Sequence, residues 1–397
     1  MNLVIFTHPP FLSSQSMPKY VQMLAKGMRM RGHKVELWRP KSRFFLLPLP
    51  KSMRKWMGYL DQYILFPIEI SRRIKTCSRD TLFVFADQSL GLWVPQVATL
   101  PHIIHCHDFL AQKSALGEIP EHATGWTGKQ YQRLIRRGFS RGKHFISVSE
   151  NTREDLHRFL PSPSLSEVIY NGLNQPFGLQ DVEYARNILA QKTCLDLSKG
   201  YVLHVGGNQW YKNRIGVIEI YNAWRFNSSA KLPLIMIGAS PSRDLLRTYS
   251  QSSFKDDIHL LSGIDDELVR MAYSGASVLL FPSLSEGFGW PIAEAMASGC
   301  PVITTNEAPM TEVAGGAGFL ISRRPNCEAA VTSWARGAAD VLNKVVELSS
   351  EDRREVVNAG LRNVKRFQSE VAISNIEMIY KKVLQKYYSD ENSPCYC

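Results

Sequence analysis

Short apolar segments alternate with amphipathic segments along almost the whole chain. The apolar segments have the length and the residue types of buried strands: 3–7, 34–38, 81–85, 102–106, 144–148, 168–170, 201–205, 234–238, 258–260, 278–281 and 302–304. The segments between them repeat apolar positions with a helical period, most clearly at 19–30, 129–137, 213–224 and 267–273. Near-continuous apolar strands that alternate with helices are typical of parallel sheets covered on both faces. Because the pattern runs through twice, we predict an α/β protein of two doubly wound domains.

A run of turn-forming residues divides the two halves of the chain. It spans 171–176, reads NGLNQP and directly follows the sixth predicted strand. We therefore predict an N-terminal domain at 1–173 and a C-terminal domain at 174–370. Toward the end of the chain the pattern predicts successive helices, and we treat 371–397, with its final helix, as a separate segment.

The composition limits the class of protein. A chain of 397 residues with 44% apolar and 21% charged residues is globular and long enough for two domains. No run approaches the ~18 consecutive apolar residues of a membrane span, and the first ten residues lack the marks of a secretory signal. Seven cysteines show no zinc-ligand spacing, and only Cys395 and Cys397 lie close together, which favours free thiols in a reducing cytoplasm.

Positive charge is concentrated in the first half. Residues 1–173 contain 24 Lys and Arg against 12 Asp and Glu, whereas residues 174–397 contain 23 against 24. A basic half beside a neutral half suggests that only the first meets an acidic partner. A phospholipid surface, a diphospholipid or acidic glycan acceptor, and nucleic acid each meet that description, and so does a charge that serves only solubility.

Candidate chemistry is expected at the strand ends, because open parallel sheets bind ligands outside the carboxyl ends of their strands. With two such sheets, the cleft between the domains is the expected site. The most informative segment, 281–302, reads FPSLSEGFGWPIAEAMASGCPV. Gly287 and Gly289 allow backbone N–H groups to approach an anion, and Pro291 suits the first position of a helix whose N-terminus adds a positive dipole end.

Two carboxylates flank this glycine turn. Glu286 falls in the loop, and Glu294, eight positions later, is expected in the first turn of the helix. A carboxylate can accept two hydrogen bonds from a vicinal diol, which both a ribose and a hexose offer. The alternative is a helix-capping Glu beside glycines that serve a tight turn.

The whole segment resembles the E-x7-E signature of glycosyltransferase family 4. The resemblance implies a GT-B fold of two Rossmann-like domains that face each other across a cleft. It also implies retention at the anomeric carbon and no obligatory metal or other cofactor. By the same resemblance Glu286 contacts the donor sugar, Glu294 contacts the ribose, and the backbone at Gly287, Phe288 and Gly289 holds the sugar or the diphosphate.

A second segment, 201–213, reads YVLHVGGNQWYKN and resembles the first strand and glycine turn of the family's donor-binding domain. The resemblance places Gly206 and Gly207 beside the donor, and Lys212 with Asn213 at its diphosphate, where Lys212 acts as a point charge. Many family members have an arginine in place of Gly207, and Arg214 is a candidate substitute.

In the first half, three histidines lie near the end of one predicted strand, within the segment 102–108 that reads HIIHCHD. His107 matches the position at which the family has a histidine that bonds the transferred sugar. His105 and His107 share a strand face, but no third ligand has suitable spacing, so we predict no metal site. The loop at 13–18, SSQSMP, departs from the Gly-Gly pair that many members have there.

Two basic segments concern the acceptor. Residues 41–75 contain eight Lys and Arg against Asp61 and Glu69, with aromatic and aliphatic residues between them, and residues 129–143 contain six Lys and Arg and no acid. This mixture suits an anionic membrane surface or a diphospholipid-linked glycan. A solvated face above buried aromatic residues is the alternative.

Together these features predict a retaining hexosyltransferase of polysaccharide or glycolipid biosynthesis, located in the cytoplasm or on the cytoplasmic face of a membrane. Its partners are a nucleotide-sugar donor and a glycan or diphospholipid-linked acceptor, and no nucleic acid is expected because no reading motif is present. We predict catalytic roles for His107, Lys212 and Glu286. Two alternatives stay open: another GT-B chemistry such as epimerisation or phosphorolysis, and an inactive or regulatory nucleotide-sugar-binding subunit. The donor's base, its sugar and the acceptor are not determined by the sequence.

Overall fold

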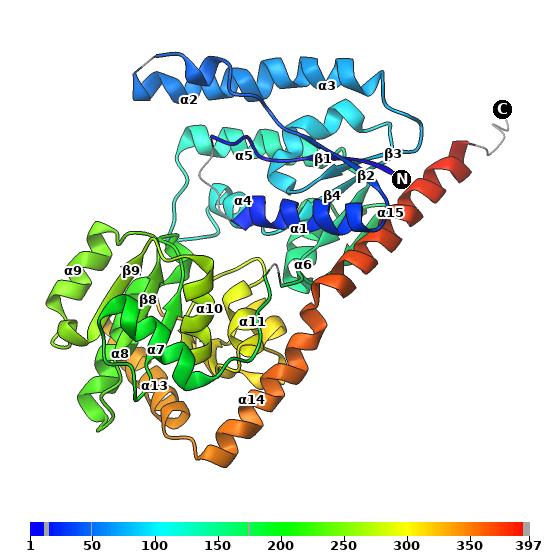
Figure 1. The fold of residues 1–397 in the computed structure, drawn as a ribbon. Coiled ribbons are helices and arrows are strands. Elements are labelled where there is room, and N and C mark those ends of the chain that lie inside the picture. The colour runs from blue at the N-terminus through cyan, green and yellow to red at the C-terminus, as the bar shows by residue number, and fades with distance from the viewer. Residues whose placement is uncertain (12–15, 49, 174, 392–397) are drawn as a thin grey trace. The chain divides into compact units, whose positions relative to one another are not determined.

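The computed structural model describes residues 1–11, 16–48, 50–173 and 175–391, and the chain divides into two compact units. Unit 1 comprises 1–174 and 369–397, and unit 2 comprises 175–368. Asn174, most of the loop at 13–18, and Cys395 with Cys397 lie outside the described residues. Figure 1 labels many of the elements of both units.

Unit 1 is built on a sheet of six parallel strands in the order β2-β1-β3-β4-β5-β6. Strands β3 and β4 are buried at every position, as expected for a sheet covered on both faces. The elements are β1 (Asn2–Phe6), α1 (Ser16–Met30), β2 (Lys34–Trp38), a 3-10 turn (Phe44–Leu46), α2 (Lys51–Leu60), a π-helical turn (Asp61–Leu65), α3 (Phe66–Ile74), β3 (Thr81–Phe85), a 3-10 segment (Gln88–Val97), β4 (His102–Cys106), α4 (Leu110–Leu116), α5 (Trp126–Phe139), β5 (His144–Ser147), α6 (Glu150–Phe159), β6 (Leu165–Val168) and α15 (Ser369–Glu391).

Unit 2 repeats the plan with six parallel strands in the order β12-β11-β10-β7-β8-β9. Its elements are α7 (Val182–Thr193), β7 (Val202–Val205), a 3-10 turn (Trp210–Lys212), α8 (Arg214–Asn227), β8 (Leu234–Gly238), α9 (Arg243–Gln251), a 3-10 turn (Lys255–Asp257), β9 (Ile258–Ser262), α10 (Asp266–Gly275), β10 (Val278–Phe281), α11 (Trp290–Ala297), β11 (Val302–Thr305), α12 (Met310–Ala314), a 3-10 turn (Gly315–Ala317), β12 (Phe319–Ile321), α13 (Glu328–Val346), α14 (Ser350–Val364) and a 3-10 turn (Lys365–Phe367).

The core of unit 1 is rich in aromatic side chains. Phe6 and Phe85, on neighbouring strands, stack with ring centroids 4.5 Å apart, and Trp38 and Phe66 pack edge-on against Phe6. Stacked and edge-to-face rings contribute about 0.5–1.5 kcal/mol per pair beyond the area they bury. This core fixes the strands whose carboxyl ends carry the polar residues described below.

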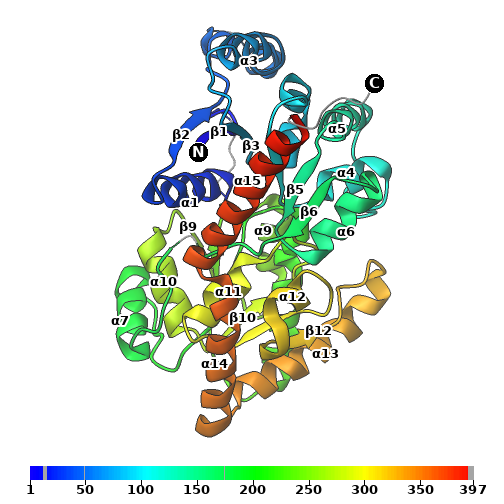
Figure 2. The ribbon, with the colours of Figure 1, turned by 90° about the vertical axis from the view of Figure 1, so that its right-hand side faces the viewer.

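The last helix, α15, belongs to unit 1 although unit 2 precedes it in the chain. Its Tyr380 hydroxyl lies 2.8 Å from Nε2 of His105 on β4, and Glu377 pairs with Arg31 and His33 beyond the end of α1. Figure 2 shows α15 running beside α1. A buried hydrogen bond and an ion-pair cluster therefore hold this helix on unit 1.

Two strands differ most from the sequence prediction, whereas the others agree with it to within two residues at each end. Strand β6 runs over 165–168 instead of 168–170, because this half-buried edge strand contains Ser166 and Glu167 and lacks an apolar run. Strand β12 was not predicted at all, since it has only three residues and Leu320 is exposed. Both are edge strands, where burial constrains the sequence least.

Candidate functional site

A buried ion pair joins two loops of unit 2. Nζ of Lys212, in the 3-10 turn after β7, lies 2.7 Å from Oε1 of Glu286, in the loop after β10. Ser283 Oγ lies 2.6 Å from the same oxygen, and both charged side chains are at most 15% exposed. The fold thus unites two predicted site residues that are 74 positions apart. Because β7 and β10 are neighbours in the sheet, the pair stands at the carboxyl edge where ligands are expected.

Asn213 fixes the first of these loops. Its backbone is left-handed, with φ of 49°, a conformation that asparagine tolerates better than most residues. Its side-chain oxygen accepts from the N–H of Gly216 and so caps α8, while its amide donates to the carbonyl of Pro282 at 2.8 Å. The residue predicted to bind the donor diphosphate therefore also ties the loop after β7 to the loop after β10.

The glycine turn before α11 has the backbone conformation that requires glycine. Gly289 has φ of 101° and occupies the cap position of the helix. Pro291 is the second helical residue, and Glu294 lies in the second turn, so the prediction that Glu294 stands in the first turn was wrong. The helix begins at Trp290, one residue before the predicted start at Pro291, which makes Glu294 its fifth residue.

Glu294 is held by a buried tyrosine. The hydroxyl of Tyr273, on α10, donates to Oε2 of Glu294 at 2.8 Å. Burial and the nearby negative charge raise the pKa of Tyr273 well above its usual value, so the hydroxyl stays a donor. The carboxylate predicted to bind ribose is therefore oriented before any ligand arrives.

Several buried polar groups near Gly206 have no partner in the described part of the chain. They are Nε2 of His204 and two guanidinium nitrogens of Arg214. The third nitrogen of Arg214 donates to Asn208 at 2.6 Å and to the carbonyl of Ala239 at 2.9 Å. Arg214 is only 6% exposed, and burial lowers its pKa. Its predicted contact with a phosphate stays a prediction.

Gly206 and Gly207 follow β7 in a crowded turn. A Cβ at Gly206 would come within 2.9 Å of the His204 ring, and one at Gly238 on β8 would meet the Gly206 carbonyl at 1.9 Å. The two strand ends approach each other so closely that a side chain at Gly238 cannot be accommodated there. This explains the glycines at Gly206 and Gly238 by packing, and the donor-binding role of Gly206 and Gly207 stays a prediction.

In unit 1, His107 follows β4, as predicted. Its Nε2 bonds the carbonyl of Ala86 at 2.9 Å, and its backbone N–H donates to Gln88 at 2.9 Å. The ring is 7% exposed, and burial, partly opposed by the charge of Asp87, lowers its pKa, which favours the neutral imidazole. His107 is thus held in one orientation with Nε2 as the donor.

Two residues at the same edge of the sheet were missed by the sequence analysis. Nε2 of His8, just beyond β1, lies 2.9 Å from Oδ2 of Asp87, just beyond β3. The other carboxylate oxygen accepts from the N–H of Ser89 at 2.8 Å. Burial raises the pKa of Asp87, but the bond with His8 and the influence of His107 outweigh it and bring the value to about 2. His8 and Asp87 follow the predicted strands 3–7 and 81–85, and this position is the signal by which the sequence could have identified them.

His105 has a structural role. Its two nitrogens bond the hydroxyls of Tyr20, at 2.7 Å, and Tyr380, at 2.8 Å, and burial lowers its pKa to about 3. Among residues 1–11, 16–48, 50–173 and 175–391, no group of three or more His, Cys, Asp or Glu could hold a metal ion. Within these same ranges, no helix is both long enough and apolar enough to cross a bilayer.

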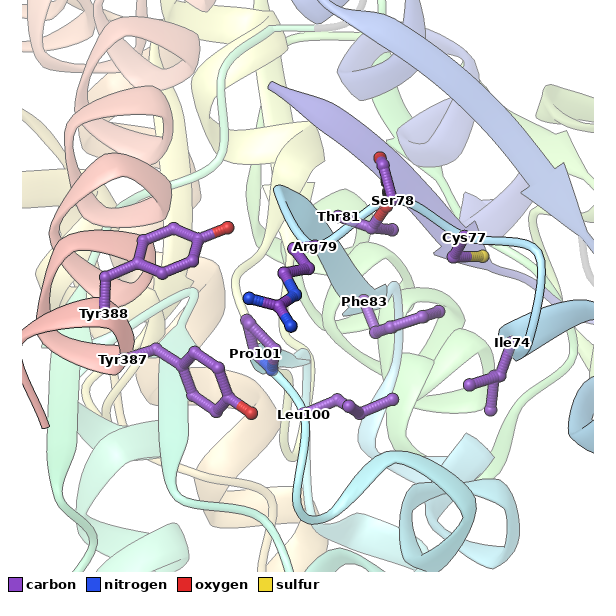
Figure 3. A pocket seen from close by; sticks show the side chains of 10 residues that line it. All are labelled: Ile74, Cys77, Ser78, Arg79, Thr81, Phe83, Leu100, Pro101, Tyr387 and Tyr388. Atoms are coloured by element: carbon purple, nitrogen blue, oxygen red, sulfur yellow. Dashed lines mark hydrogen bonds between the residues drawn. The ribbon is translucent and has the colours of Figure 1, made fainter. Parts of the chain in front are cut away.

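A pocket of about 590 Å³ opens at the opposite edge of the same sheet. Figure 3 shows the side chains that line it, which include Arg79 before β3, Pro101 before β4, and Tyr387 and Tyr388 of α15. The pocket lies at the amino ends of the strands. It is therefore distinct from the cluster formed by His8, Asp87 and His107.

The fold, together with the loops after β7 and β10, defines a class of protein. Two six-stranded parallel sheets with flanking helices form a two-domain GT-B α/β fold. The crystal structure of Anabaena HepE in complex with UDP and glucose shares this fold, with a TM-score of 0.71 and 16% identity over 96% of this chain and 100% of that one. A family model described as Glycosyltransferase Family 4 matches residues 17–175, and one described as Glycosyl transferases group 1 matches residues 186–355. The chain belongs to glycosyltransferase family 4.

Several curated relatives carry the names of mannosyltransferases. The O-antigen chain mannosyltransferase B of Escherichia coli is 30% identical over 186 residues, which is 46% of each chain. The MMP alpha-(1->4)-mannosyltransferase of Mycolicibacterium hassiacum is 28% identical over 354 residues, 86% of this chain and 80% of the relative. The matched part spans about half the length of the two O-antigen relatives.

Proposed function

We propose that this protein transfers a sugar from a nucleoside-diphosphate sugar to a glycan or lipid-linked acceptor, with retention at the anomeric carbon. The observation that carries this proposal is the buried pair of Lys212 and Glu286 beside the glycine turn of unit 2. The mannosyltransferase names of its relatives support a hexose donor and a role in polysaccharide or glycolipid biosynthesis.

The chemistry follows from the charges of the pair. When the bond between the anomeric carbon and the diphosphate oxygen breaks, its electrons leave with the diphosphate. The Lys212 ammonium and the backbone N–H groups of the glycine turn stabilise the charge that grows there. Glu286, kept in place by Ser283 and Lys212, accepts hydrogen bonds from the sugar hydroxyls, and Glu294 accepts them from the ribose. None of these steps requires a metal ion.

A binding screen tests the donor site. UDP, GDP, ADP and their common sugar conjugates are titrated calorimetrically into the wild type, Glu294→Ala and a control, Glu355→Ala, which alters an exposed acid on α14. We expect one nucleotide family to bind and its affinity to fall about tenfold in Glu294→Ala, the loss of one charge-assisted hydrogen bond. The control should bind as the wild type does.

Two outcomes would overturn the proposal. If no nucleotide binds, the inactive or regulatory alternative replaces the transferase. If the donor alone is converted to its epimer, or if the sugar is released by inorganic phosphate as a sugar phosphate, the site performs another GT-B chemistry. Product analysis by NMR distinguishes these cases and gives the anomeric configuration directly.

We also propose that unit 1 docks on an anionic membrane through the α2–α3 surface, defined as the exposed side chains of residues 41–75. Its exposed apolar members are Phe44, Leu46, Leu47, Met53, Trp56, Ile64 and Ile68. Its exposed cations are Lys41, Arg43, Arg54, Arg72 and Lys75. Apolar side chains flanked by cations suit the boundary between lipid headgroups and acyl chains.

The acids of this segment are turned away from solvent or paired. Asp61 is 1% exposed and accepts three backbone N–H bonds from residues 43–45, at 2.9–3.1 Å. Glu69 pairs with Arg73 at 3.5 Å and with Lys41 at 4.0 Å. The segment therefore presents cations and apolar groups without an unpaired acid, which favours an anionic surface over a solvated face.

Vesicle binding tests the docking surface. Wild type, Trp56→Ala and the control Phe226→Ala, which removes an exposed ring from unit 2, are floated with vesicles of phosphatidylglycerol and phosphatidylcholine in equal parts. Trp56 is 62% exposed, and loss of its burial in lipid should weaken binding about tenfold. High salt should weaken binding of all three variants. A wild type that ignores these vesicles at low salt would disprove docking.

A further inference from the structure

We propose that the pocket at the amino ends of the unit 1 strands binds a sugar ring that carries an acidic group, either a carboxylate or a phosphate. Its volume of about 590 Å³ is in the range of small-molecule sites. The pocket belongs to unit 1 alone, because the end of α15 is part of that unit. This site goes beyond the proposed transfer reaction, and only its link to the acceptor rests on that function.

Arg79 supplies the positive charge of the pocket. Its side chain is exposed, and Figure 3 shows it extending from the loop before β3 toward the two tyrosines of α15. Among the side chains that the structure describes, none forms an ion pair or a hydrogen bond with its guanidinium. A planar guanidinium can donate two parallel hydrogen bonds to one carboxylate or phosphate. Arg79 is therefore available to an acidic ligand.

The acid next to Arg79 in the sequence is bonded elsewhere. Oδ1 of Asp80 accepts a hydrogen bond from the side-chain amide of Asn2 at 2.8 Å, and the same amide donates to Oγ of Ser78 at 2.7 Å. Asp80 is not among the ten residues that line the pocket, and none of those ten is acidic. The lining thus carries a positive charge that no lining acid compensates.

Two adjacent tyrosines of α15 form one wall. The rings of Tyr387 and Tyr388 are half-buried, with centroids 6.1 Å apart and planes at 80°. The hydroxyl of Tyr387 donates to the carbonyl of Thr99 at 3.0 Å, which fixes that ring. Phe83 and Pro101, both buried, add apolar surface. Aromatic rings offer a large apolar face together with a polar hydroxyl, and the C–H groups of a sugar ring can pack on such a face.

The combination of groups favours an acidic sugar over simpler ligands. An inorganic phosphate would meet Arg79 but would leave the apolar lining in water. A neutral sugar would pack on the tyrosine rings but would not use the charge of Arg79. A sugar ring that carries a carboxylate or a phosphate satisfies both parts of the lining, and it is the ligand class that we infer.

The position of the pocket suggests how it serves the proposed reaction. Strand β3 has five residues, so its amino and carboxyl ends are about 17 Å apart. A longer acidic glycan could be bound at the pocket while its end lies at the carboxyl edge of the same sheet. A second contact on one chain raises the effective concentration of that end at the first site. The pocket would then favour long acceptors over short ones.

Titration with defined sugars, followed by ligand-observed NMR, tests the pocket. The acidic probes are a tetrasaccharide of alternating glucuronate and N-acetylglucosamine, and mannose 6-phosphate. Their neutral counterparts are a tetramer of N-acetylglucosamine, and mannose. The proteins are wild type, Arg79→Ala, Arg79→Lys and the control Arg336→Ala, which removes an exposed arginine from α13.

We expect at least one acidic probe to bind, about tenfold more tightly than its neutral counterpart. Its affinity should fall about tenfold in Arg79→Ala, less in Arg79→Lys, which keeps the charge without the paired donors, and not at all in Arg336→Ala. Tyr388→Ala should weaken binding about fivefold through loss of the ring contact. The unfolding midpoint of Arg79→Ala should equal that of the wild type.

Several results would overturn the inference. They are binding of no acidic probe, equal binding of acidic and neutral probes, and an equal loss of affinity in Arg79→Ala and Arg336→Ala. Inorganic phosphate that binds as tightly as the sugars would show an anion site without sugar recognition, and UDP that displaces the acidic probe would show a nucleotide site. Nucleotide binding without sugar binding at this pocket would leave the proposed function intact. Sugar binding without any nucleotide binding would overturn the proposed function and leave this site standing.

Discussion

The two units share one architecture and differ at the carboxyl ends of their strands. Each has six parallel strands, yet unit 1 places His8, Asp87 and His107 there, whereas unit 2 places Lys212 and Glu286 beside a glycine turn. Imidazole rings beside a carboxylate stand on one scaffold, and an ammonium beside a carboxylate and a glycine turn stands on the other. The comparison shows that loop residues give each copy of the fold its chemistry.

One buried histidine in each sheet shows a second difference between the units, in the hydrogen bonds that its two nitrogens make. In unit 1, His105 has both nitrogens bonded, whereas in unit 2 His204 bonds Leu280 through Nδ1 at 3.0 Å and leaves Nε2 unpaired. An unpaired buried polar group costs about 1–3 kcal/mol. His204 of unit 2 therefore carries a stability cost that His105 of unit 1 does not.

The largest effect should come from the charged pair of unit 2. Lys212→Ala removes the cation that we propose stabilises the leaving diphosphate, and we expect turnover to fall about 10²–10³-fold, as for other hydrogen-bond donors aimed at developing charge. The measurement is nucleoside diphosphate release at saturating donor, with the exposed Lys231→Ala as control. A rate within threefold of the wild type would show that the charge at Lys212 is not used in the reaction.

The next effect concerns the stability of unit 1. Tyr380→Phe leaves Nε2 of His105 buried without a partner, which should lower the free energy of unfolding by about 1–3 kcal/mol. Urea unfolding followed by circular dichroism measures it, and Tyr387→Phe, whose more exposed hydroxyl bonds Thr99, is the matched control. Equal losses in both variants would contradict a special role for the buried bond.

The smallest effect per residue is a pH dependence of stability shared by both units. Burial lowers the pKa of His102 to about 4 and those of His105 and His204 to about 3, below the unfolded value of about 6.5. The unfolded chain then binds more protons, so stability is complete above pH ~6.5 and is lost as the pH falls toward those folded values. Each histidine should contribute about 1.4 kcal/mol of loss at pH 5.5.

Urea unfolding at pH 7.5 and pH 5.5 checks this expectation. Replacement of His204 by Phe should reduce the difference by about 1.4 kcal/mol, because the unfolded chain then has one fewer group that takes up a proton in this pH range. An unfolding free energy that is equal at the two pH values would show that these histidines are already protonated in the folded protein.

The sequence predicted most of the sheet framework, because burial leaves a strong pattern. Strands β2, β3, β4, β8 and β10 were predicted to the residue. All but β2 are near-continuous apolar runs in sheet interiors, and β2 is bounded by the Gly32–His33 turn and Pro40. The edge strands β6 and β12 were misplaced or missed, since exposure relaxes the choice of residue there. The helix that contains Glu294 was predicted to begin at Pro291 and begins one residue earlier, at Trp290, because the start of a helix depends on the exact cap.

The site was predictable only where residues form a motif. Lys212 and Glu286 were found because each lies in a long matched segment, although their contact could come only from the fold. His8 and Asp87 were missed because each is a single polar residue after an apolar strand, and nothing local links residues 79 positions apart. Register and strand order, not sequence, brought them together.

The membership of α15 in unit 1 has a consequence for how the chain is made. Domains generally fold as units while synthesis proceeds from the N-terminus. Unit 2 is continuous and has all its residues once 368 has been added, but unit 1 still lacks the helix that bonds His105. The first domain to emerge from the ribosome is thus the second to be completed. Until Tyr380 has been synthesised, Nε2 of His105 can form this hydrogen bond only with water.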